Sequence, residues 1–346
     1  MDQTFYIQWH ITNYCSLGCR HCYQDDFSRD KDLDWPALKR LSDNILTTLE
    51  GWNRKGCIHL TGGEPLLKPE LIPLLAYLDQ QPMVEELGII TNGLPLDGEM
   101  VGRLSAFGKL KKIKISLDGG DAETHDSIRP AGTFQRVMRN LPLVQEGGRF
   151  EVILMFTALK RNFESLPSLI RLAEDRGVGG VIIERFIFWG RGRSISGEIL
   201  GREEWRDLVE NLLAFFSLEA QGDEIPSFQA FQVDFRGERP ELMGAPCILG
   251  EDGLCLMPEG TVFPCRRFPF PLGNLLEDSL KTVWEGSELL AKLRDKGSLK
   301  GKCKSCGREG CTGCRSLAYS LTGDFFAEDP HCWHSECDPA RARGKG

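Results

Sequence analysis

Short apolar runs alternate with longer amphipathic stretches along the first two thirds of the chain. The apolar runs have the length of buried strands and lie near residues 5–12, 56–61, 84–91, 112–117, 150–158 and 180–188. Apolar residues recur at helical spacing over residues 34–50, 69–80, 97–107, 133–146, 164–176 and 202–220. This alternation predicts six parallel strands, each followed by a crossover helix.

The length of this first part decides between a closed and an open barrel. A closed barrel of eight strand–helix units takes about 250 residues, whereas the six units here occupy roughly 215. We therefore predict an α/β fold over residues 1–221, a partial (β/α)6 barrel resembling an incomplete TIM barrel. An open barrel leaves a cleft at the ends of its strands.

The rest of the chain has a different pattern. Residues 222–246 carry Gly, Pro and charged residues without clean periodicity, which indicates a bridging region. Residues 247–338 combine many cysteines with Gly and Pro and one amphipathic helix near 278–294. Such a Cys-rich, loop-rich domain has little apolar core of its own and needs metal to fold. Residues 339–346 are predicted to be a flexible tail.

Composition and charge exclude several classes of protein. No apolar run approaches the ~18 residues that a membrane span needs, and the N-terminus lacks the features of a secretory signal, so we expect a cytoplasmic protein that does not span a membrane. The formal net charge of −8 argues against a nucleic-acid partner. One segment, 292–315, is basic; it is either a solvated face that offsets thiolate charge or a docking surface for an acidic peptide or redox protein.

The thirteen cysteines fall into two groups. Three lie within residues 15–22, Cys57 stands alone, and nine lie between Cys247 and Cys337. In a reducing compartment, clustered cysteines indicate metal binding rather than disulfides. The chain is therefore expected to have a front metal site and a rear one.

The front group, Cys15-x3-Cys19-x2-Cys22, directly follows the first predicted strand. A structural zinc ion normally takes four ligands, and no fourth Cys or His has a suitable spacing, although His10 or His21 could serve. A 4Fe-4S cluster held by three cysteines has one iron without a protein ligand. A bidentate amino acid can bind that iron.

These residues resemble the signature of the radical S-adenosylmethionine (SAM) superfamily. The resemblance implies that SAM binds the open iron and that a flavodoxin- or ferredoxin-type reductant supplies the electron that cleaves it. The resulting 5′-deoxyadenosyl radical then abstracts hydrogen from a substrate. No residue of this chain is assigned a catalytic role beyond this chemistry.

Further segments resemble the SAM-binding residues of the superfamily. Gly62, Gly63, Glu64 and Pro65, after the second strand, resemble the segment that holds the methionine amine of SAM, although alone they would be a turn. By the same resemblance, Ser116 lies near the ribose or carboxylate of SAM and His21 near its adenine. Either Arg129 or Arg136 is expected to reach the same ligand.

The rear cysteines resemble the SPASM extension, a twitch-like domain with auxiliary 4Fe-4S clusters. The family's interleaved pattern implies one cluster held by Cys247, Cys255, Cys265 and Cys314, and a second held by Cys303, Cys306, Cys311 and Cys337, with Cys332 as the alternative last ligand. The spacing around Cys311 and Cys314 departs from the pattern, so their register stays open. The repeated Cys-x2-Cys also permits zinc knuckles. The resemblance implies three clusters in all, one that binds SAM and two that relay electrons.

The resemblance is to the branch that modifies peptides and proteins. It implies a peptide or small-protein substrate that is oxidatively modified, for example by a crosslink, as in the maturation of ribosomally made peptides. Arg266 and Arg267 follow Cys265 where anaerobic sulfatase-maturating enzymes place an acidic base, and arginine cannot serve as that base. Because the barrel begins at residue 5, we expect a separate leader-recognition protein or none.

Two other functions stay open. The first is maturation of a small molecule or cofactor, such as a haem precursor or the tungsten cofactor. The second is a non-catalytic metal-binding scaffold. Neighbouring genes would separate the peptide hypothesis from the small-molecule hypothesis.

Overall fold

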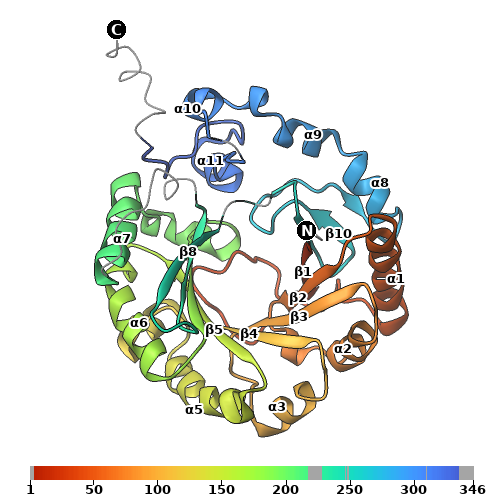
Figure 1. The fold of residues 1–346 in the computed structure, drawn as a ribbon, viewed down its shortest axis with the longest axis horizontal. Coiled ribbons are helices and arrows are strands. Elements are labelled where there is room, and N and C mark those ends of the chain that lie inside the picture. The colour runs from red at the N-terminus through yellow and green to blue at the C-terminus, as the bar shows by residue number, and fades with distance from the viewer. Residues whose placement is uncertain (1–3, 217–227, 246, 248, 309, 335–346) are drawn as a thin grey trace.

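The computed structural model describes residues 4–216, 228–245, 247, 249–308 and 310–334. Within these residues the strands form one sheet in the order β11-β10-β9-β1-β2-β3-β4-β5-β6-β7-β8. Figure 1 shows the sheet curving around the centre of the molecule with helices outside it. No helix in the described ranges is long and apolar enough to cross a membrane.

The six predicted barrel strands are present and parallel to one another. They are β1 (Phe5–Thr12), β2 (Gly56–Gly62), β3 (Val84–Thr91), β4 (Leu110–Ser116), β5 (Glu151–Ala158) and β6 (Gly180–Arg185). The helices around them are α1 (Trp35–Gly51), α2 (Leu71–Asp79), α3 (Gly98–Leu104), α4 (Ala122–Ile128), α5 (Thr133–Gln145), α6 (Leu166–Asp175) and α7 (Arg202–Phe215). The predicted open α/β barrel is confirmed; α4 was not predicted.

Alternation along each strand separates the core from the interior of the barrel. On β1, Phe5, Ile7 and Trp9 are fully buried and belong to the main hydrophobic core, which includes Leu38 and Leu41 of α1. The intervening side chains point inward, as expected from the period of two in a strand. Barrel strands therefore present an apolar face to the helices and a largely polar face to the interior.

The sheet continues beyond both edges of the barrel. β7 (Ala230–Asp234) pairs antiparallel with β6, and β8 (Glu241–Ala245) pairs antiparallel with β7, so part of the predicted bridging region is sheet. At the other edge β9 (Gly253–Leu256) is parallel to β1, and β10 (Thr261–Phe263) and β11 (Gly273–Asn274) follow antiparallel. The rear region, residues 247–334 as described, thus shares a sheet with the barrel.

The rear region contains four short helices: α8 (Leu280–Glu285), α9 (Glu288–Arg294), α10 (Gly301–Ser305) and α11 (Arg315–Thr322). The prediction of one helix over 278–294 was wrong, because α8 ends at Glu285 with Gly286 as its C-cap. The Ser287 hydroxyl then accepts from Leu290 N (3.2 Å) to start α9. Glycine is disfavoured in helix interiors, and serine is favoured at N-caps. In Figure 1 these helices, in blue, extend from α1 towards α7.

The rear helices pack on the barrel rather than on a core of their own. Trp284 of α8 meets Phe5 of β1 edge to face, with ring centroids 5.2 Å apart. Asn44 of α1 donates to the carbonyls of Leu275 (2.9 Å) and Asp278 (2.8 Å).

Short 3-10 turns occur at η1 (Pro65–Leu67), η2 (Glu146–Gly148), η3 (Phe163–Ser165), η4 (Gly190–Glu198) and η6 (Lys296–Ser298).

Candidate active site

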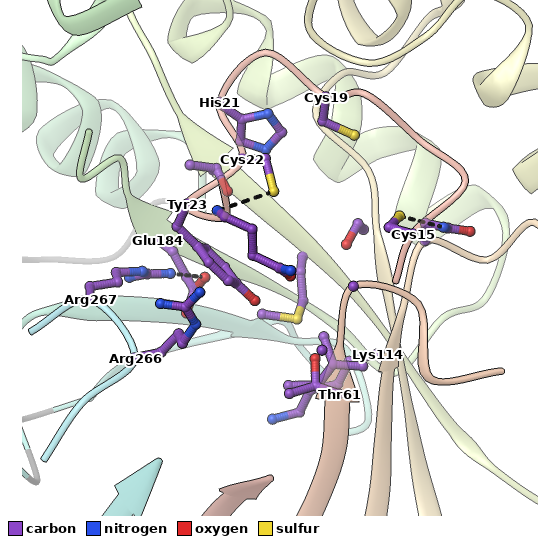
Figure 2. Close-up of a pocket in the computed structure, with 18 of the residues that line it drawn as sticks. Cys15, Cys19, His21, Cys22, Tyr23, Thr61, Lys114, Glu184, Arg266 and Arg267 are labelled. Carbon is purple, nitrogen blue, oxygen red and sulfur yellow. Dashed lines mark hydrogen bonds and ion pairs between the residues drawn. The ribbon is translucent and has the colours of Figure 1, made fainter. Parts of the chain in front are cut away.

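A cavity of about 290 Å³ lies inside the barrel, towards the carboxyl ends of its strands. Its lining includes the cysteine trio, Cys15, Cys19 and Cys22, which lies in the loop after β1. Cys265, from the rear region, lines the same cavity. Figure 2 shows the trio on one side of the cavity, with Arg266 and Arg267 on another side.

The cysteine trio is surrounded by hydrogen-bond donors. Leu17 N donates to Cys15 Sγ (3.4 Å), Gln24 N donates to Cys22 Sγ (3.5 Å), and Arg129 Nη1 lies 3.8 Å from Cys19 Sγ. Burial raises the pKa of Cys15 to about 11, so without a bound metal its thiol stays protonated at neutral pH. Donors of this kind stabilise thiolate ligands once a metal is present.

The spacing of the trio argues against a single zinc ion. Zinc binds thiolate at about 2.3 Å, so two thiolates on one tetrahedral ion lie about 3.8 Å apart. In the described part of the chain, the Cys, His, Asp and Glu groups whose ligand atoms lie within 4.8 Å of one another are limited to Cys57, His59 and Glu86. The three sulfurs of the trio therefore do not all lie within that distance of one another.

Cys57, His59 and Glu86 contact one another near the amino ends of the barrel strands, away from the cysteine trio. Cys57 Sγ and His59 Nε2 each lie 3.5 Å from Glu86 Oε1, and Lys112 Nζ binds both oxygens of Glu86 at 3.0 and 2.9 Å. The lysine already neutralises the carboxylate. Cys57 is thus part of a polar network rather than an isolated thiol.

His21 and Arg129 meet at a buried carboxylate. Asp118 is completely buried and accepts from Arg129 Nε (2.6 Å) and Thr157 N (2.9 Å), with His21 Nε2 at 3.2 Å. Burial alone would raise the pKa of Asp118, but Arg129 brings it below its usual value. Burial lowers the pKa of His21 to about 4, so the ring is neutral at pH 7.

The two arginines expected from the sequence as alternative SAM contacts, Arg129 and Arg136, have different positions in the structure. Arg129 lines the cavity, whereas Arg136 is exposed on α5. Two nearby aspartates differ in the same way, because Asp121 caps α4 by accepting from Thr124 N (2.8 Å). Asp118 is bound to Arg129 instead.

Gly62 and Gly63 are required by a close approach of two backbone segments. A Cβ atom on Gly62, whose φ is +141°, would lie 2.1 Å from Thr12 O, and one on Gly63 would lie 2.3 Å from Tyr14 O. Gly63 N donates to Thr12 O (2.9 Å). The glycines thus hold the cysteine loop against the end of β2, and both line the cavity together with Ser116.

Glu64 and Pro65 lie behind the cavity wall. The Glu64 side chain is fully buried and accepts from Leu66 N (3.1 Å), Thr91 Oγ1 (2.7 Å) and Asn92 N (2.8 Å). Burial raises its pKa to about 7. The carboxylate expected to meet the SAM amine is therefore engaged by the protein itself, while Pro65 begins η1.

Several cavity residues were not predicted from the sequence. Lys114 projects from β4 and Glu184 from β6, and Arg267 Nη2 binds Glu184 Oε2 at 2.5 Å. Arg266 stacks over the ring of Tyr23, with 4.4 Å between its guanidinium carbon and the ring centroid. One signal was available: Lys112, Lys114 and Ser116 alternate along a predicted strand and so share a polar face.

The rear region gathers a second set of cysteines. Cys303, Cys306, Cys311 and Cys332 line one small cavity, and we call them the far rear set. Cys337, the first choice for the last ligand, lies outside the described residues. Arg315 Nη2 lies 3.8 Å from Cys303 Sγ, and Asp329 N donates to the same sulfur (3.3 Å). The alternative last ligand, Cys332, lines the cavity of this set.

Three other cysteines form the near rear set: Cys247, Cys265 and Cys314. Burial raises the pKa of Cys247, and the neighbouring charges of Cys314 and Cys265 raise it further. Cys255, expected in the same set, is buried on β9 with its sulfur 4.0 Å from Met257 Sδ, and Cys265 contributes to the raised pKa of its thiol. No three thiols of the described rear region lie within 4.8 Å of one another, which disfavours zinc knuckles.

The barrel and the two rear sets meet at one ion pair. Arg185, at the end of β6, binds Asp329 with 3.0 Å between Nη1 and Oδ2, and both side chains are 1% exposed. Asp329 also accepts from Cys314 N (2.8 Å), while its own backbone amide donates to Cys303. Despite burial, Arg185 and these donors lower the pKa of Asp329 to about 2.

Comparison with known proteins identifies the family. Residues 9–173 match the family model of the radical SAM superfamily, and residues 247–307 match the SPASM model, an iron-sulfur cluster-binding domain. The chain belongs to the radical SAM superfamily. As a radical SAM protein with a SPASM region it is an enzyme whose cofactors are SAM and 4Fe-4S clusters.

Relatives of this radical SAM enzyme have different named activities. It is 29% identical over 348 residues to the AdoMet-dependent heme synthase of Methanosarcina barkeri, covering 94% of this chain and 95% of that protein. It is 28% identical over 358 residues to the mycofactocin maturase MftC of Mycobacterium tuberculosis, covering 99% and 86%. Its fold is similar to that of Streptococcus suis SuiB bound to precursor peptide SuiA, with TM-score 0.70, 15% identity and coverage of 96% and 76%.

Proposed function

We propose that this radical SAM enzyme is a maturase that abstracts hydrogen from a peptide or protein substrate and oxidises it. One observation carries the proposal: the cysteine trio and Cys265 of the near rear set line the same cavity. A substrate in that cavity would lie between the site that generates a radical and a site that accepts an electron. The named activity of MftC and the peptide complex of SuiB support a peptide substrate.

Each cofactor has a proposed set of residues. Cys15, Cys19 and Cys22 would hold the SAM-binding cluster, with Gly62, Gly63, Ser116 and His21 beside the ligand and with Glu64 and Pro65 supporting that wall. Cys247, Cys255, Cys265 and Cys314 would hold one auxiliary cluster, and Cys303, Cys306, Cys311 and either Cys332 or Cys337 the other. When bound and reduced, the front cluster supplies the electron that cleaves SAM to a 5′-deoxyadenosyl radical. This gives three clusters per chain.

The chain's own residues would shield and orient this chemistry. Arg129 lies near Cys19 and is held by Asp118, so it contributes a fixed positive charge beside the thiolates. Trp189 Nε1 donates to Arg267 O (2.8 Å), which ties the barrel to the segment after Cys265. A flavodoxin- or ferredoxin-type protein is the proposed reductant, and a separate protein would recognise any leader peptide.

A second candidate function is maturation of a small carboxylate-bearing molecule of the tetrapyrrole class. Two observations favour it: the named activity of the Methanosarcina barkeri relative, and the several cations of the cavity wall, Lys114, Arg266 and Arg267. The same radical chemistry would act on either substrate. The two candidates differ in what must enter the cavity.

The proposal is tested on anaerobically reconstituted enzyme. We expect about twelve irons per chain and release of 5′-deoxyadenosine from SAM under reducing conditions. Incubation with short peptides encoded beside the gene should yield a product that has lost two hydrogens per modification, detected by mass spectrometry. Conversion of a porphyrin carboxylate and of no peptide would favour the second candidate. Stoichiometric zinc without SAM cleavage would contradict both.

A further inference from the structure

The cavity contains more positive charge than its own carboxylates neutralise. The charged residues among its lining, neutral histidine aside, are Lys114, Arg129, Glu184, Arg185, Arg266 and Arg267. Three of the cations have carboxylate partners: Arg129 pairs with Asp118, Arg185 with Asp329 and Arg267 with Glu184. Lys114 and Arg266 are left.

Neither of these two cations forms an ion pair with a carboxylate in the described part of the chain, although Arg266 lies near the thiols of Cys22 and Cys255. Lys114 Nζ makes no hydrogen bond or ion pair there; the main negative charge acting on it is Glu184, which already binds Arg267. Arg266 stacks on Tyr23, and its Nε is buried without a hydrogen-bond partner among the described residues. In Figure 2 both side chains lie on the side of the cavity away from Cys19.

Both side chains are partly buried, and the Nε atom of Arg266 is fully buried. Desolvation of a charge is unfavourable unless an opposite charge or hydrogen bonds offset it. A protein can retain such cations where a ligand supplies the missing charge. The planar guanidinium of arginine matches a carboxylate in a bidentate geometry, and a lysine ammonium adds a point charge.

We propose that Lys114 and Arg266 form an anion subsite that anchors a carboxylate of the substrate. The inference rests on the proposed function, because it takes this cavity as the substrate site, and it names the chemistry of the substrate. The carboxylate belongs either to a peptide, through an acidic side chain or the C-terminus, or to the acid side chains of a tetrapyrrole. Both sources present the same group to the two cations.

The test measures binding to the reconstituted holoenzyme with SAM and without reductant. The probes are a short Asp- and Glu-containing peptide with its Asn and Gln counterpart, and a porphyrin tetracarboxylate with its tetramethyl ester. We expect one acid probe to bind at least about tenfold more tightly than its neutral counterpart, because charge-assisted hydrogen bonds are roughly twice as strong as neutral ones. The pair that shows the preference identifies the source of the carboxylate.

Variants then assign the preference to the two cations. Lys114→Gln and Arg266→Gln should each reduce it about tenfold, whereas Lys114→Arg and Arg266→Lys should retain most of it. Lys111→Gln is the matched control, because Lys111 is an exposed residue of the same strand outside the cavity lining. Cluster absorbance and the melting temperature of each variant show whether it has folded.

Several results would overturn the subsite. These are equal binding of acid and neutral probes, no binding of either acid probe, or a preference that survives both glutamine variants. Loss of SAM affinity in those variants without loss of probe affinity would assign the cations to SAM instead. Because binding needs no radical chemistry, such a failure leaves the proposed function standing if wild-type SAM cleavage is intact; absent cleavage would refute the proposed function separately.

Discussion

The cysteine trio and the far rear set present their thiols from different kinds of scaffold. The trio lies in a loop clamped by the barrel: Gly63 N donates to Thr12 O, Glu64 N to Tyr14 O and Gly192 N to Cys22 O. The first two donors directly follow β2, which the hydrophobic core fixes, and the third lies in η4. In the far rear set, Cys303 lies on the five-residue helix α10 and Cys332 in a turn.

The difference indicates where folding depends on metal. A site built on the rim of a packed barrel can be preorganised before any ligand binds. A set on short helices and turns has few backbone hydrogen bonds to hold it, so metal ligation must contribute to its stability. We therefore expect metal loss to abolish chemistry at the trio and to loosen structure at the far rear set.

The largest expected effect is at the trio. Cys15→Ala should abolish SAM cleavage, because it removes a ligand of the proposed SAM-binding cluster, and should leave roughly eight irons per chain. The melting temperature should change little if the barrel preorganises the loop. Iron analysis, 5′-deoxyadenosine release and thermal unfolding check these outcomes. Cys57→Ala, outside both sites, is the control; retained cleavage in Cys15→Ala would refute the assignment.

The far rear set should behave in the opposite way. Cys306→Ala should lose about four irons and lower the melting temperature, while SAM cleavage without substrate persists. Comparing Cys332→Ala with Cys337→Ala identifies the last ligand, since only the true ligand should reproduce the iron loss of Cys306→Ala. An unchanged iron content in Cys306→Ala would show that this set holds no cluster.

The same contrast explains how much the sequence revealed. The barrel strands and the trio followed from periodicity and from the position of a motif at a strand end, both local properties. The break at Gly286 and Ser287 was also local, yet the apolar spacing continues across it and suggested one helix. The strands β7 to β11 are too short for their pattern to stand out from loops.

Side-chain partners were harder to predict than positions. Glu64 lies in a motif whose resemblance implied contact with SAM, but two of its partners, Thr91 and Asn92, lie at the end of β3, 27 and 28 residues later in the chain. Glu184 and Arg267 are 83 residues apart and meet only through the fold. Likewise, cysteine spacing alone could not choose between Cys332 and Cys337, because both are close enough in sequence to reach the set.

The junction between the two regions gives the next largest effect. Arg185→Met leaves the buried carboxylate of Asp329 without its cation, and breaking such a pair typically costs about 3–5 kcal/mol. Urea unfolding of the holoenzyme should show this loss. The double variant Arg185→Met with Asp329→Leu, which removes both charges, should recover part of it. A single variant as stable as wild type would show that the ion pair does not hold the regions together.

Buried histidines predict a pH dependence. Burial lowers the pKa of His59 to about 4, and His125 and His331 are lowered to about the same value. Between pH 6.5 and 4 these histidines bind protons in the unfolded chain and not in the folded chain, so their contribution to stability is complete above pH 6.5 and falls as the pH decreases. Each histidine contributes up to about 1.4 kcal/mol per pH unit. Urea unfolding at pH 7.5 and 5.5 measures the slope.

One variant separates the barrel contribution to that slope. His59→Gln should reduce the pH dependence by close to one proton, because His59 is a buried barrel histidine whose Nδ1 lies 3.0 Å from the Tyr6 hydroxyl. The remaining slope is the sum of the other buried histidines and of an opposing contribution from Glu64, whose raised pKa lets the folded chain bind a proton that the unfolded chain does not. An unchanged slope in His59→Gln would show that His59 is protonated alike in the folded and unfolded chain.

The smallest expected effect comes from removing one helix cap in the barrel and one in the rear region. Asp34 caps α1 of the barrel by accepting from Ala37 N (3.0 Å), and Ser279 caps rear helix α8 by accepting from Thr282 N (3.0 Å). Replacing either cap by alanine should cost about 1 kcal/mol. Because Asn44 of α1 also accepts from Leu280 N (2.8 Å), we expect α8 to unfold with the barrel.

Both cap variants should therefore lower one shared transition by a similar amount. Circular dichroism and cluster absorbance, recorded in the same thermal scan, follow the barrel and the clusters separately. If Ser279→Ala lowers the cluster transition and leaves the circular dichroism transition in place, the rear region unfolds on its own. That result would show that the barrel and the rear region are independent folding units. Coincident shifts would show that the two regions unfold together and differ only in the local scaffold around each set of cysteines.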